Sequence, residues 1–453
     1  AFTTGVGSVT NRDRRKPLQE LNRMISRELG INKGELKDTT IWVKVFNPDP
    51  LTTAKRQYGS NYRNFKDSNN SYLNQQMQWK SIDAEVRSDT FWLSSKWVKL
   101  LYNGKEPITS INSDSIEVTR DHWQFEYLMI YYHLKKYRDF LESIGFEQMA
   151  NYPVKANPHA YTYDNSKFIP RLDGSGSGLL NFGYCKDSCG TSIANECHVD
   201  DAEDADVIIH EYGHALSFSV NGNETSRTPR KAIDEGLSDF ITCAYSKKIG
   251  EFESDYIFNW DGRNEFWDGR KCFTSRTVND YKTGRYVEHY NGEIFAGALS
   301  EIALKIGYDE THKILFESMY SYSERMKFTD AALLFLDAEQ RVYKAENAQT
   351  VCSIFAKYNF VSDSFCMVSM ADKPNTKFYA INKRAFFENG SIVLQLNTPY
   401  ITRLKLYDAT GKLAYSSELN NQATIIESLQ LAKGTYVLVL ENQSRIFTEK
   451  MVR

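Results

Sequence analysis

Several features are absent from the sequence, and each absence narrows the possible functions. No apolar run approaches the roughly 20 residues that a membrane helix requires, so no membrane-spanning segment is predicted. A formal net charge of only −3 gives no reason to expect nucleic acid or an anionic lipid surface as a partner. The chain starts at Ala1, without methionine or a recognisable signal segment. We therefore expect a processed form that has lost a targeting peptide and any propeptide.

Cysteine is scarce, and its odd count limits the possible disulfides. Seven cysteines allow at most three pairs and leave one thiol over. Cys352 and Cys366 flank a short helix-and-loop stretch and can pair. Two members of a second group can close another small loop, and that group is Cys185, Cys189 and Cys197. Such pairs suit an oxidising compartment, although a count alone does not establish one.

The pattern of residues divides the chain into four stretches. Residues 1–38 are polar and basic, with one helical pattern, and are interpreted as an N-terminal extension or a propeptide remnant. Short β-like runs open 39–200, helical patterns dominate 201–372, and 377–453 returns to short strands of the kind found in a small β-sandwich. The predicted strands include Thr40–Phe46, Thr90–Leu93, Leu179–Tyr184, Ile392–Leu396, Leu404–Tyr407 and Tyr436–Leu440. A chain of this length needs more than one core, so we predict an α+β fold of several domains.

Two histidines four residues apart indicate a metal site. His210 and His214 follow an apolar spacing typical of a buried helix, and residues at i and i+4 project from the same face of a helix. One zinc ion at about 2.0–2.1 Å can take a nitrogen from each ring. Glu211, beside the first histidine, is placed to accept a proton from a water molecule that the metal activates. Such a string also arises by chance in about one chain in a hundred, so its surroundings decide its meaning.

A second helical segment supplies the remaining ligand. Glu235 lies twenty-one residues after His214, in a helix that Thr228–Pro229 is expected to start. Two histidines and one glutamate, with a fourth position open for water, form a catalytic zinc arrangement. Asp239 lies one turn beyond Glu235 and would accept a hydrogen bond from a ligand imidazole. The alternative is a solvated acidic helix face.

An acidic cluster precedes the first histidine and has two interpretations. It consists of Asp200, Asp201, Glu203, Asp204 and Asp206. Calcium binding is one interpretation, because this ion prefers oxygen ligands. Negative charge that stabilises a helix N-terminus is the other, and both stay open. Three further histidines, His122, His133 and His312, are expected to be surface or packing residues, whereas His159 is a candidate for the neighbourhood of the cleft.

The two metal segments resemble the active-site signature of the thermolysin and fungalysin peptidases. The resemblance is carried by His210-Glu-Tyr-Gly-His214 and Asp234-Glu-Gly-Leu-Ser-Asp239 and extends over about 120–360. It implies a two-lobed fold with a β-rich N-terminal lobe, an α-helical catalytic lobe in 201–372, and a small β-sandwich after it. It also implies that His289 stabilises the transition state and that Asn165 binds the substrate backbone.

The sequence departs from the thermolysin pattern at one functional position. Thermolysin has a tyrosine between the second histidine and the glutamate ligand that assists the oxyanion, and no tyrosine lies between Ala215 and Asp234 here. Oxyanion stabilisation would therefore depend more on His289, with Tyr286 or Tyr290 as candidate partners.

The C-terminal strands resemble the type IX secretion sorting domain of Bacteroidota. The matching segments are Leu404–Lys412, Leu431–Val439 and Lys450–Arg453. The resemblance implies that the type IX secretion machinery exports the protein across the outer membrane, so that it is released or held at the cell surface. A small β-domain that serves binding or stability is the alternative.

Taken together, these features predict a secreted zinc endopeptidase that acts on protein or peptide substrates. Two alternatives remain. A zinc aminopeptidase would use the same ligands, but the Gly-x-Met-Glu-Asn string of such enzymes is absent from the sequence. A surface adhesin with an inactive metallopeptidase-like domain would bind protein without turnover.

Overall fold

The computed structural model describes two parts of the chain. The first is 37–366, with gaps at 88–89, 102–107, 111–114, 171–177, 185–197 and 222–228. The second is 381–452, with gaps at 389–390, 397–401, 409, 420–423, 427–430, 433 and 442–445. The predicted helix near Leu18–Leu29 and the group Cys185, Cys189 and Cys197 lie outside the described residues.

An N-terminal sheet of five strands has the order β5-β3-β2-β1-β6. Its strands are β1 (Lys37–Val45), β2 (Gln78–Arg87), β3 (Thr90–Trp92), β5 (Ile108–Ser110) and β6 (Ser115–Ile116). All neighbours are antiparallel except β1 and β6. In β1, Ile41 and Val43 are buried while Trp42 between them is half exposed, which is the alternation expected of a strand with one face on a core.

A second sheet has the order β4-β7-β9-β8 and supports the helical region. Its strands are β4 (Val98–Leu100), β7 (Val154–Tyr161), β8 (Lys167–Pro170) and β9 (Gly178–Gly183). β4, β7 and β9 run parallel, and β8 pairs antiparallel with β9 as the last described strand of the sheet. The free edge of β8 therefore has backbone groups that can pair with an added strand.

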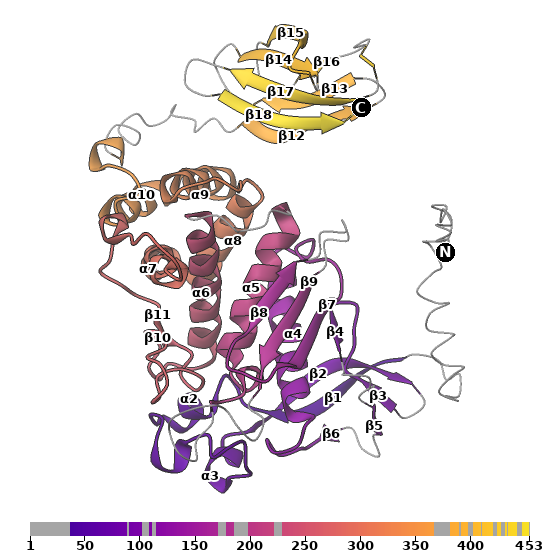
Figure 1. Ribbon diagram of the computed structural model, residues 1–453, viewed down its shortest axis with the longest axis vertical. Helices are drawn as coiled ribbons and strands as arrows, with labels where there is room; N and C mark the ends of the chain where they lie inside the picture. Colours follow the sequence, from indigo (N-terminus) through magenta and orange to yellow (C-terminus); the bar gives the residue numbers. More distant parts are fainter. Residues whose placement is uncertain are drawn as a thin grey trace, which may run out of the picture.

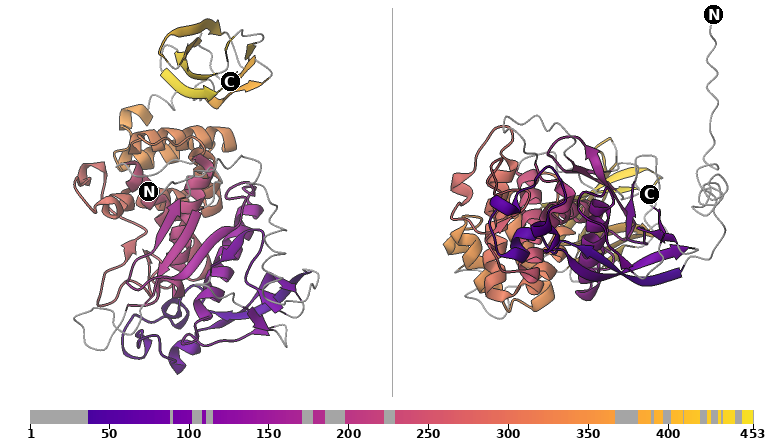
Figure 2. Two further views of the ribbon diagram at one scale, coloured as in Figure 1. Left: turned by 45° about the vertical axis from the view of Figure 1, so that its right-hand side comes forward. Right: turned by 90° about the horizontal axis from the view of Figure 1, so that it is seen from below.

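Seven longer helices build the rest of this part of the chain. They are α4 (Phe125–Ser143), α5 (Ala205–Asn221), α6 (Arg230–Ile249), α7 (Glu288–Ile306), α8 (Tyr308–Met319), α9 (Phe328–Tyr343) and α10 (Ala348–Lys357). Figures 1 and 2 show α6 to α10 gathered on one side, the N-terminal sheet on the other, and α4, α5 and the second sheet between them. Within the described residues, no helix is long and apolar enough to cross a membrane. Shorter elements are α2 (Pro50–Ala54), η1 (Ser60–Tyr62), α3 (Ser71–Asn74), η2 (Asp201–Glu203), β10 (Tyr256–Ile257), β11 (Arg270–Lys271) and η3 (Val278–Asp280).

The C-terminal part consists of two antiparallel sheets. One has the order β12-β13-β16 and the other β15-β14-β17-β18. Their strands are β12 (Ile381–Glu388), β13 (Ser391–Leu396), β14 (Thr402–Asp408), β15 (Leu413–Leu419), β16 (Thr424–Ile426), β17 (Thr435–Glu441) and β18 (Ile446–Val452). The predicted strands at Ile392–Leu396, Leu404–Tyr407 and Tyr436–Leu440 are thereby confirmed, as is the mixed α+β class.

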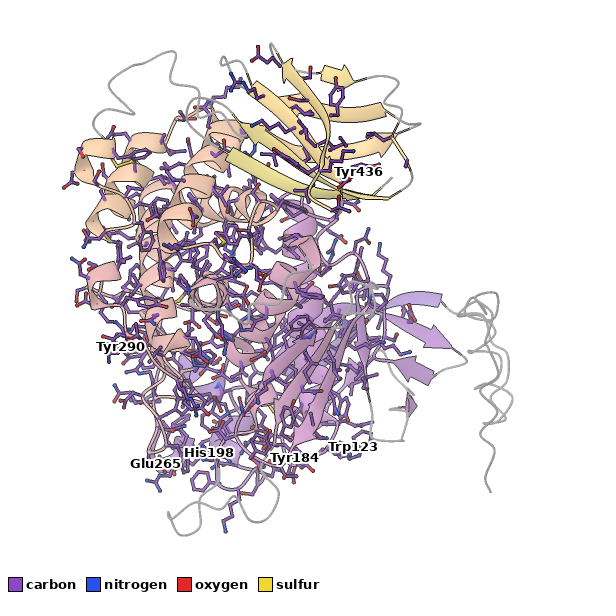
Figure 3. The ribbon with its side chains drawn as sticks, turned by 45° about the horizontal axis from the view of Figure 1, so that its top comes forward. Trp123, Tyr184, His198, Glu265, Tyr290 and Tyr436 are labelled. Carbon is purple, nitrogen blue, oxygen red and sulfur yellow. A yellow bond between two sulfur atoms is a disulfide. The ribbon has the colours of Figure 1, made fainter. Side chains whose placement is uncertain are left out.

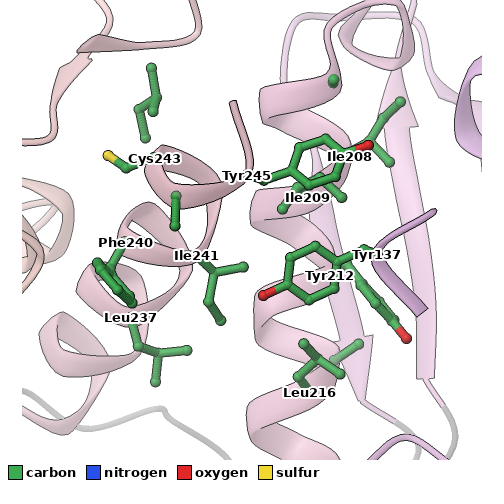
Figure 4. Packing of buried hydrophobic residues seen from close by; sticks show 14 of the residues in the cluster. Tyr137, Ile208, Ile209, Tyr212, Leu216, Leu237, Phe240, Ile241, Cys243 and Tyr245 are labelled. Carbon is green, nitrogen blue, oxygen red and sulfur yellow. The ribbon is translucent and has the colours of Figure 1, made fainter. Parts of the chain in front are cut away.

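The core joins α4, α5 and α6, as Figure 4 shows at close range. Leu237, Phe240 and Ile241 of α6 are completely buried, and so are Ile208 and Ile209 of α5. In α5 the buried positions continue at Tyr212 and Leu216, so in both helices they recur at intervals of three or four residues and each helix presents one apolar face to the other.

The structure contains two disulfides among its described cysteines. Cys352 pairs with Cys366, as the sequence predicted. Cys243 pairs with Cys272, a connection that the sequence did not indicate because the two residues are 29 positions apart. This second disulfide ties α6 to the residue that follows β11.

Glycine allows the metal-carrying helices to approach closely. A Cβ atom at Gly213 of α5 would lie 2.7 Å from Ser238 Oγ and 2.9 Å from Ser238 Cα on α6. A Cβ at Gly236 would lie 2.3 Å from the carbonyl oxygen of Gly292 on α7. Both positions therefore exclude a larger side chain unless the helices separate.

We expect Gly236→Ala to destabilise the protein by about 1–3 kcal/mol, because the added methyl group would overpack the contact between α6 and α7. Alanine in place of glycine in a helix ordinarily stabilises it, so the sign is diagnostic. Thermal and urea unfolding measure the change, with the exposed α9 substitution Thr329→Ala as a control that should shift stability by less than about 0.5 kcal/mol. Equal or greater stability of Gly236→Ala would contradict the packing argument.

Candidate metal centre

Helices α5 and α6 bring three candidate ligands to one point. The Nε2 atoms of His210 and His214 lie 3.2 Å apart. Glu235 Oε2 lies 3.3 Å from the first of these nitrogens and 3.5 Å from the second. Ligands about 2.0–2.1 Å from a tetrahedral zinc ion are separated by about 3.3 Å, so the three distances fit this ion. The residues therefore form a group that could hold a metal ion, with the donor set and spacing that zinc prefers.

Each histidine is oriented by a carboxylate behind it. His210 Nδ1 lies 2.9 Å from Asp239 Oδ1, and His214 Nδ1 lies 2.7 Å from Asp234 Oδ2. The contact at His214 is a hydrogen bond, and the contact at His210 is an ion-pair contact. A proton held at Nδ1 in this way leaves Nε2 without a proton and turned toward the metal position. Asp239, which the sequence predicted as a partner of a ligand imidazole, lies beside the His210 ring, whereas Asp234 was not assigned such a contact. The spacing Arg230–Asp234 and the position of Asp234 beside Glu235 were the available signals.

Two arginines compensate the charges of these carboxylates. Arg270 Nη1 lies 2.6 Å from Asp239 Oδ1, and Arg230 Nη1 lies 3.1 Å from Asp234 Oδ1. Burial by itself would raise the pKa of Asp239, but Arg270 and His210 outweigh it and hold this pKa below its ordinary value. Asp234 behaves in the same way, with burial opposed by Arg230 and His214. Both carboxylates are therefore charged at neutral pH.

Arg270 is a site residue that sequence reasoning missed. It lies in β11, thirty-one residues beyond Asp239, and no motif marks the position. The Cys243–Cys272 disulfide joins its neighbourhood to α6. Arg270 also lines the cavity above the metal position, with its guanidinium 3.9 Å from Glu235 Oε2.

A cavity of about 870 Å³ opens on the metal position. The candidate ligands line it, together with Glu211, His289, Asn165, Tyr286 and Tyr290. Glu211 is 6% exposed, and its Oε2 atom is buried without a hydrogen-bond partner among the described residues. His289 Nε2 lies 3.2 Å from Glu235 Oε2. The cavity thus combines a metal position, an unpartnered carboxylate oxygen and a partly exposed imidazole.

Asn165 and the strand β8 also line the cavity. Asn165 lies two residues before β8, and Phe168 and Pro170 of this strand also line the cavity. The edge strand therefore borders the space in front of the metal position. Pro229, where the sequence predicted a helix start, lies at the N-cap of α6, and Thr228 lies outside the described residues.

The other histidines lie outside this cavity. His133 is buried, with Nδ1 2.8 Å from the hydroxyl of Tyr245, and His312 is buried with Nδ1 2.8 Å from the carbonyl oxygen of Tyr308. His122 is exposed. The prediction of surface or packing roles is confirmed for these three. His159, the candidate for the cleft, does not line the cavity and contacts the rings of Tyr127 and Tyr184.

The acidic cluster before α5 does not gather around one point. Glu203 pairs with the buried Arg120. Asp204 Oδ2 accepts hydrogen bonds from the backbone N–H groups of Trp260 and Asp261, and Asp206 Oδ2 accepts one from that of Phe258. Among the described residues, no three members of the cluster form a group that could hold a metal ion. The tertiary contacts therefore distribute the members of the cluster among different partners, and only Asp201 belongs to a described group of carboxylates that could hold a metal ion.

The C-terminal strands match a family of secretion domains. Residues 388–453 match the secretion system C-terminal sorting domain. The resemblance drawn from the sequence of the tail is thereby confirmed, and the match indicates that the protein is secreted.

Part of the chain is similar to extracellular metalloproteinases of fungi. It is 29% identical over 197 residues to extracellular metalloproteinase 2 of Phaeosphaeria nodorum. The matched region covers 38% of this chain and 30% of the relative. The chain is also 29% identical over 195 residues to extracellular metalloproteinase MEP of Fusarium vanettenii, again with 38% of this chain and 30% of the relative covered. Extracellular metalloproteinase 9 of Coccidioides posadasii is 23% identical over 272 residues, with 50% and 42% covered. The chain thus matches less than half the length of these relatives, which are distant, partial homologues.

We expect Asp239→Asn to weaken zinc binding about 10–100-fold, because the amide cannot hold the His210 ring as the charged carboxylate does. Competition with a zinc chelator measures the affinity. Asp309→Asn serves as the control, because it removes an exposed carboxylate of α8 that pairs with Lys248. This variant should leave the zinc affinity unchanged. Wild-type zinc affinity in Asp239→Asn would refute the orienting role.

Proposed function

We propose that the protein is a secreted zinc endopeptidase that hydrolyses internal peptide bonds of proteins. The observation that carries this proposal is the convergence of His210, His214 and Glu235 beside the unpartnered oxygen of Glu211. Similarity to extracellular metalloproteinases supports the same class. The fold proposed with it is a two-lobed thermolysin-like peptidase, with a catalytic lobe in 201–372 and a sorting β-sandwich in 377–453.

Zinc, when bound, would polarise the scissile carbonyl and lower the pKa of a coordinated water toward about 7. Glu211 is the proton carrier in this proposal, since its free Oε2 atom faces the same cavity as the ligands. It accepts the proton of the attacking water and then delivers it to the leaving amine. No other carboxylate is needed for this transfer.

His289 and Arg270 are proposed to stabilise the negative charge that develops on the carbonyl oxygen. His289 is half exposed at the cavity wall, so its ring can meet a bound substrate. Arg270 is held in place by Asp239 and carries a permanent charge. Tyr286 and Tyr290 line the same wall and remain candidate donors. Each such donor is worth a few kcal/mol in comparable sites.

The free edge of β8 supports endopeptidase rather than aminopeptidase activity. An extended peptide can add to this edge through backbone hydrogen bonds, with Asn165 as a further partner at its start. Binding of this kind reads the backbone of an internal segment and requires no free terminus. The substrates are therefore proteins or peptides with accessible extended segments.

For the C-terminal sheets, we propose that the type IX secretion machinery recognises them and exports the protein to the exterior or the cell surface. The match to a secretion sorting domain supports it. The N-terminal residues 1–38 are proposed to be an extension or a propeptide remnant. An adhesin with an inactive domain is the second candidate function, which zinc-dependent turnover of a protein such as casein would exclude.

We expect Glu211→Gln to retain fold and zinc while its kcat/KM falls by about 10²–10⁴-fold, because the amide cannot accept the proton. Hydrolysis of a quenched peptide and elemental analysis of the same sample measure both properties. Lys231→Gln changes another cavity residue without removing a proton acceptor and should retain most activity. Full activity in Glu211→Gln would refute the assignment.

Peptides blocked at both ends test the mode of attack. We expect internal cleavage of such peptides, loss of that cleavage on chelation, and recovery after one equivalent of zinc is restored. An enzyme that cleaves only peptides with a free N-terminus would be an aminopeptidase. Binding of casein without turnover by the zinc-loaded protein would favour the adhesin.

A further inference from the structure

Three aspartates from separate segments meet on the wall of the cavity. Asp164 lies shortly before β8, Asp201 begins η2, and Asp261 lies four residues after β10. One carboxylate oxygen from each lies within 4.8 Å of the others. None of the three is a candidate zinc ligand. The group therefore forms a separate concentration of negative charge with only oxygen donors.

Two of these carboxylates have buried oxygen atoms without a partner. Asp201 is 2% exposed and Asp261 is 4% exposed. The Oδ1 atom of each is buried and accepts no hydrogen bond within the described residues. The other oxygen of Asp201 is satisfied, since it accepts hydrogen bonds from the Ser166 hydroxyl and the Gly183 N–H group. A buried carboxylate oxygen with no partner is costly, so these two atoms point to a ligand.

The positive charges nearby do not neutralise the group. No lysine or arginine of the described part of the chain forms an ion pair with any of the three aspartates. His198 Nδ1 lies 2.8 Å from Asp164 Oδ2, and Arg270 is engaged by Asp239. Burial, together with the neighbouring carboxylates, raises the pKa of Asp201 and Asp261 well above the ordinary value. A bound cation would remove that repulsion.

We propose that Asp164, Asp201 and Asp261 bind one calcium ion, separate from the zinc site. Calcium takes oxygen ligands at about 2.3–2.6 Å, so ligands on opposite sides of it are about 4.6–5.2 Å apart, which accommodates the observed limit of 4.8 Å. Three carboxylates without a nitrogen or sulfur donor suit this hard cation better than zinc. The unpartnered oxygens are buried, which fits an ion better than the larger head group of a substrate arginine or lysine.

The position of the group allows water to complete the coordination. Asp164 and Asp201 line both the large cavity and a smaller one of about 270 Å³, which His198 and Tyr184 also line. Figure 3 labels these last two residues at the same edge of the molecule. Water from either side can supply the additional ligands that calcium requires. The ion ties the segment before β8 and the segment after β10 to η2, which precedes the zinc helix α5.

Calorimetry on metal-stripped protein reloaded with one zinc tests this proposal. We expect one calcium ion per wild-type chain and an increase in the unfolding temperature with calcium concentration. Asp201→Asn and Asp261→Asn should each lower the calcium affinity at least tenfold, since each removes one charged ligand. Asp139→Asn removes an exposed carboxylate of α4 and should bind calcium like the wild type. Circular dichroism identifies any variant that fails to fold, and Asp164→Asn, at an exposed position, then supplies the second measurement.

Several outcomes would overturn the proposal. One is wild-type protein that binds no calcium at millimolar concentration, and another is unchanged calcium affinity in both buried variants. A second zinc ion that is lost in Asp261→Asn would show that the group selects a different metal. Altered cleavage of lysine- or arginine-containing peptides by Asp261→Asn, without calcium binding in the wild type, would assign the group to the substrate. Because calcium binding is measured without turnover, its failure is distinguishable from failure of the peptidase proposal.

Discussion

The close approach of α6 to α5 is the constraint on which the site depends. Gly213 faces Ser238 at a distance that leaves no room for a Cβ atom, and Gly236 makes the same kind of contact with α7. With the helix axes held at this separation, Glu235 Oε2 comes within 3.5 Å of both histidine nitrogens. A wider spacing would leave two histidines on one helix and a carboxylate on another with no shared coordination point. The apolar faces in Figure 4 provide the stability that this packing requires.

Buried charged side chains surround the metal position, and each histidine is linked through an aspartate to an arginine. Each histidine contacts an aspartate, and each aspartate contacts an arginine, which gives the chains His210–Asp239–Arg270 and His214–Asp234–Arg230. Removing one member would leave its neighbour charged and buried, which is the costly case for buried ion pairs. The Cys243–Cys272 disulfide holds the Arg270 segment against α6. Orientation of the candidate ligands is thus maintained by residues from two separate parts of the chain, α6 and β11.

Much of the fold and of the site was predictable, because it depends on short-range periodicity. Alternation predicted strands such as Ile392–Leu396, and the four-residue spacing of His210 and His214 predicted one helix face. The Cys352–Cys366 pair was predictable because only 14 residues separate its members. The contacts of the acidic cluster were not predictable, for the opposite reason. Its members are adjacent in sequence, but their partners are Arg120, Trp260 and Asp261, which lie 56 to 83 positions away.

By itself, the sequence supplied the signals for the proposed class of chemistry: two histidines and a glutamate in helical spacing, a second glutamate beside the first histidine, and a tail with the strands of a sorting domain. These signals are local, since a helix turn or a strand places residues that are only a few positions apart. Only the tertiary structure decided which residues orient the ligands and which aspartates face one another. Asp234, Arg270 and the trio Asp164, Asp201 and Asp261 acquire their roles from contacts between distant segments. Such contacts are set by packing of whole elements, and no periodicity in the sequence records them.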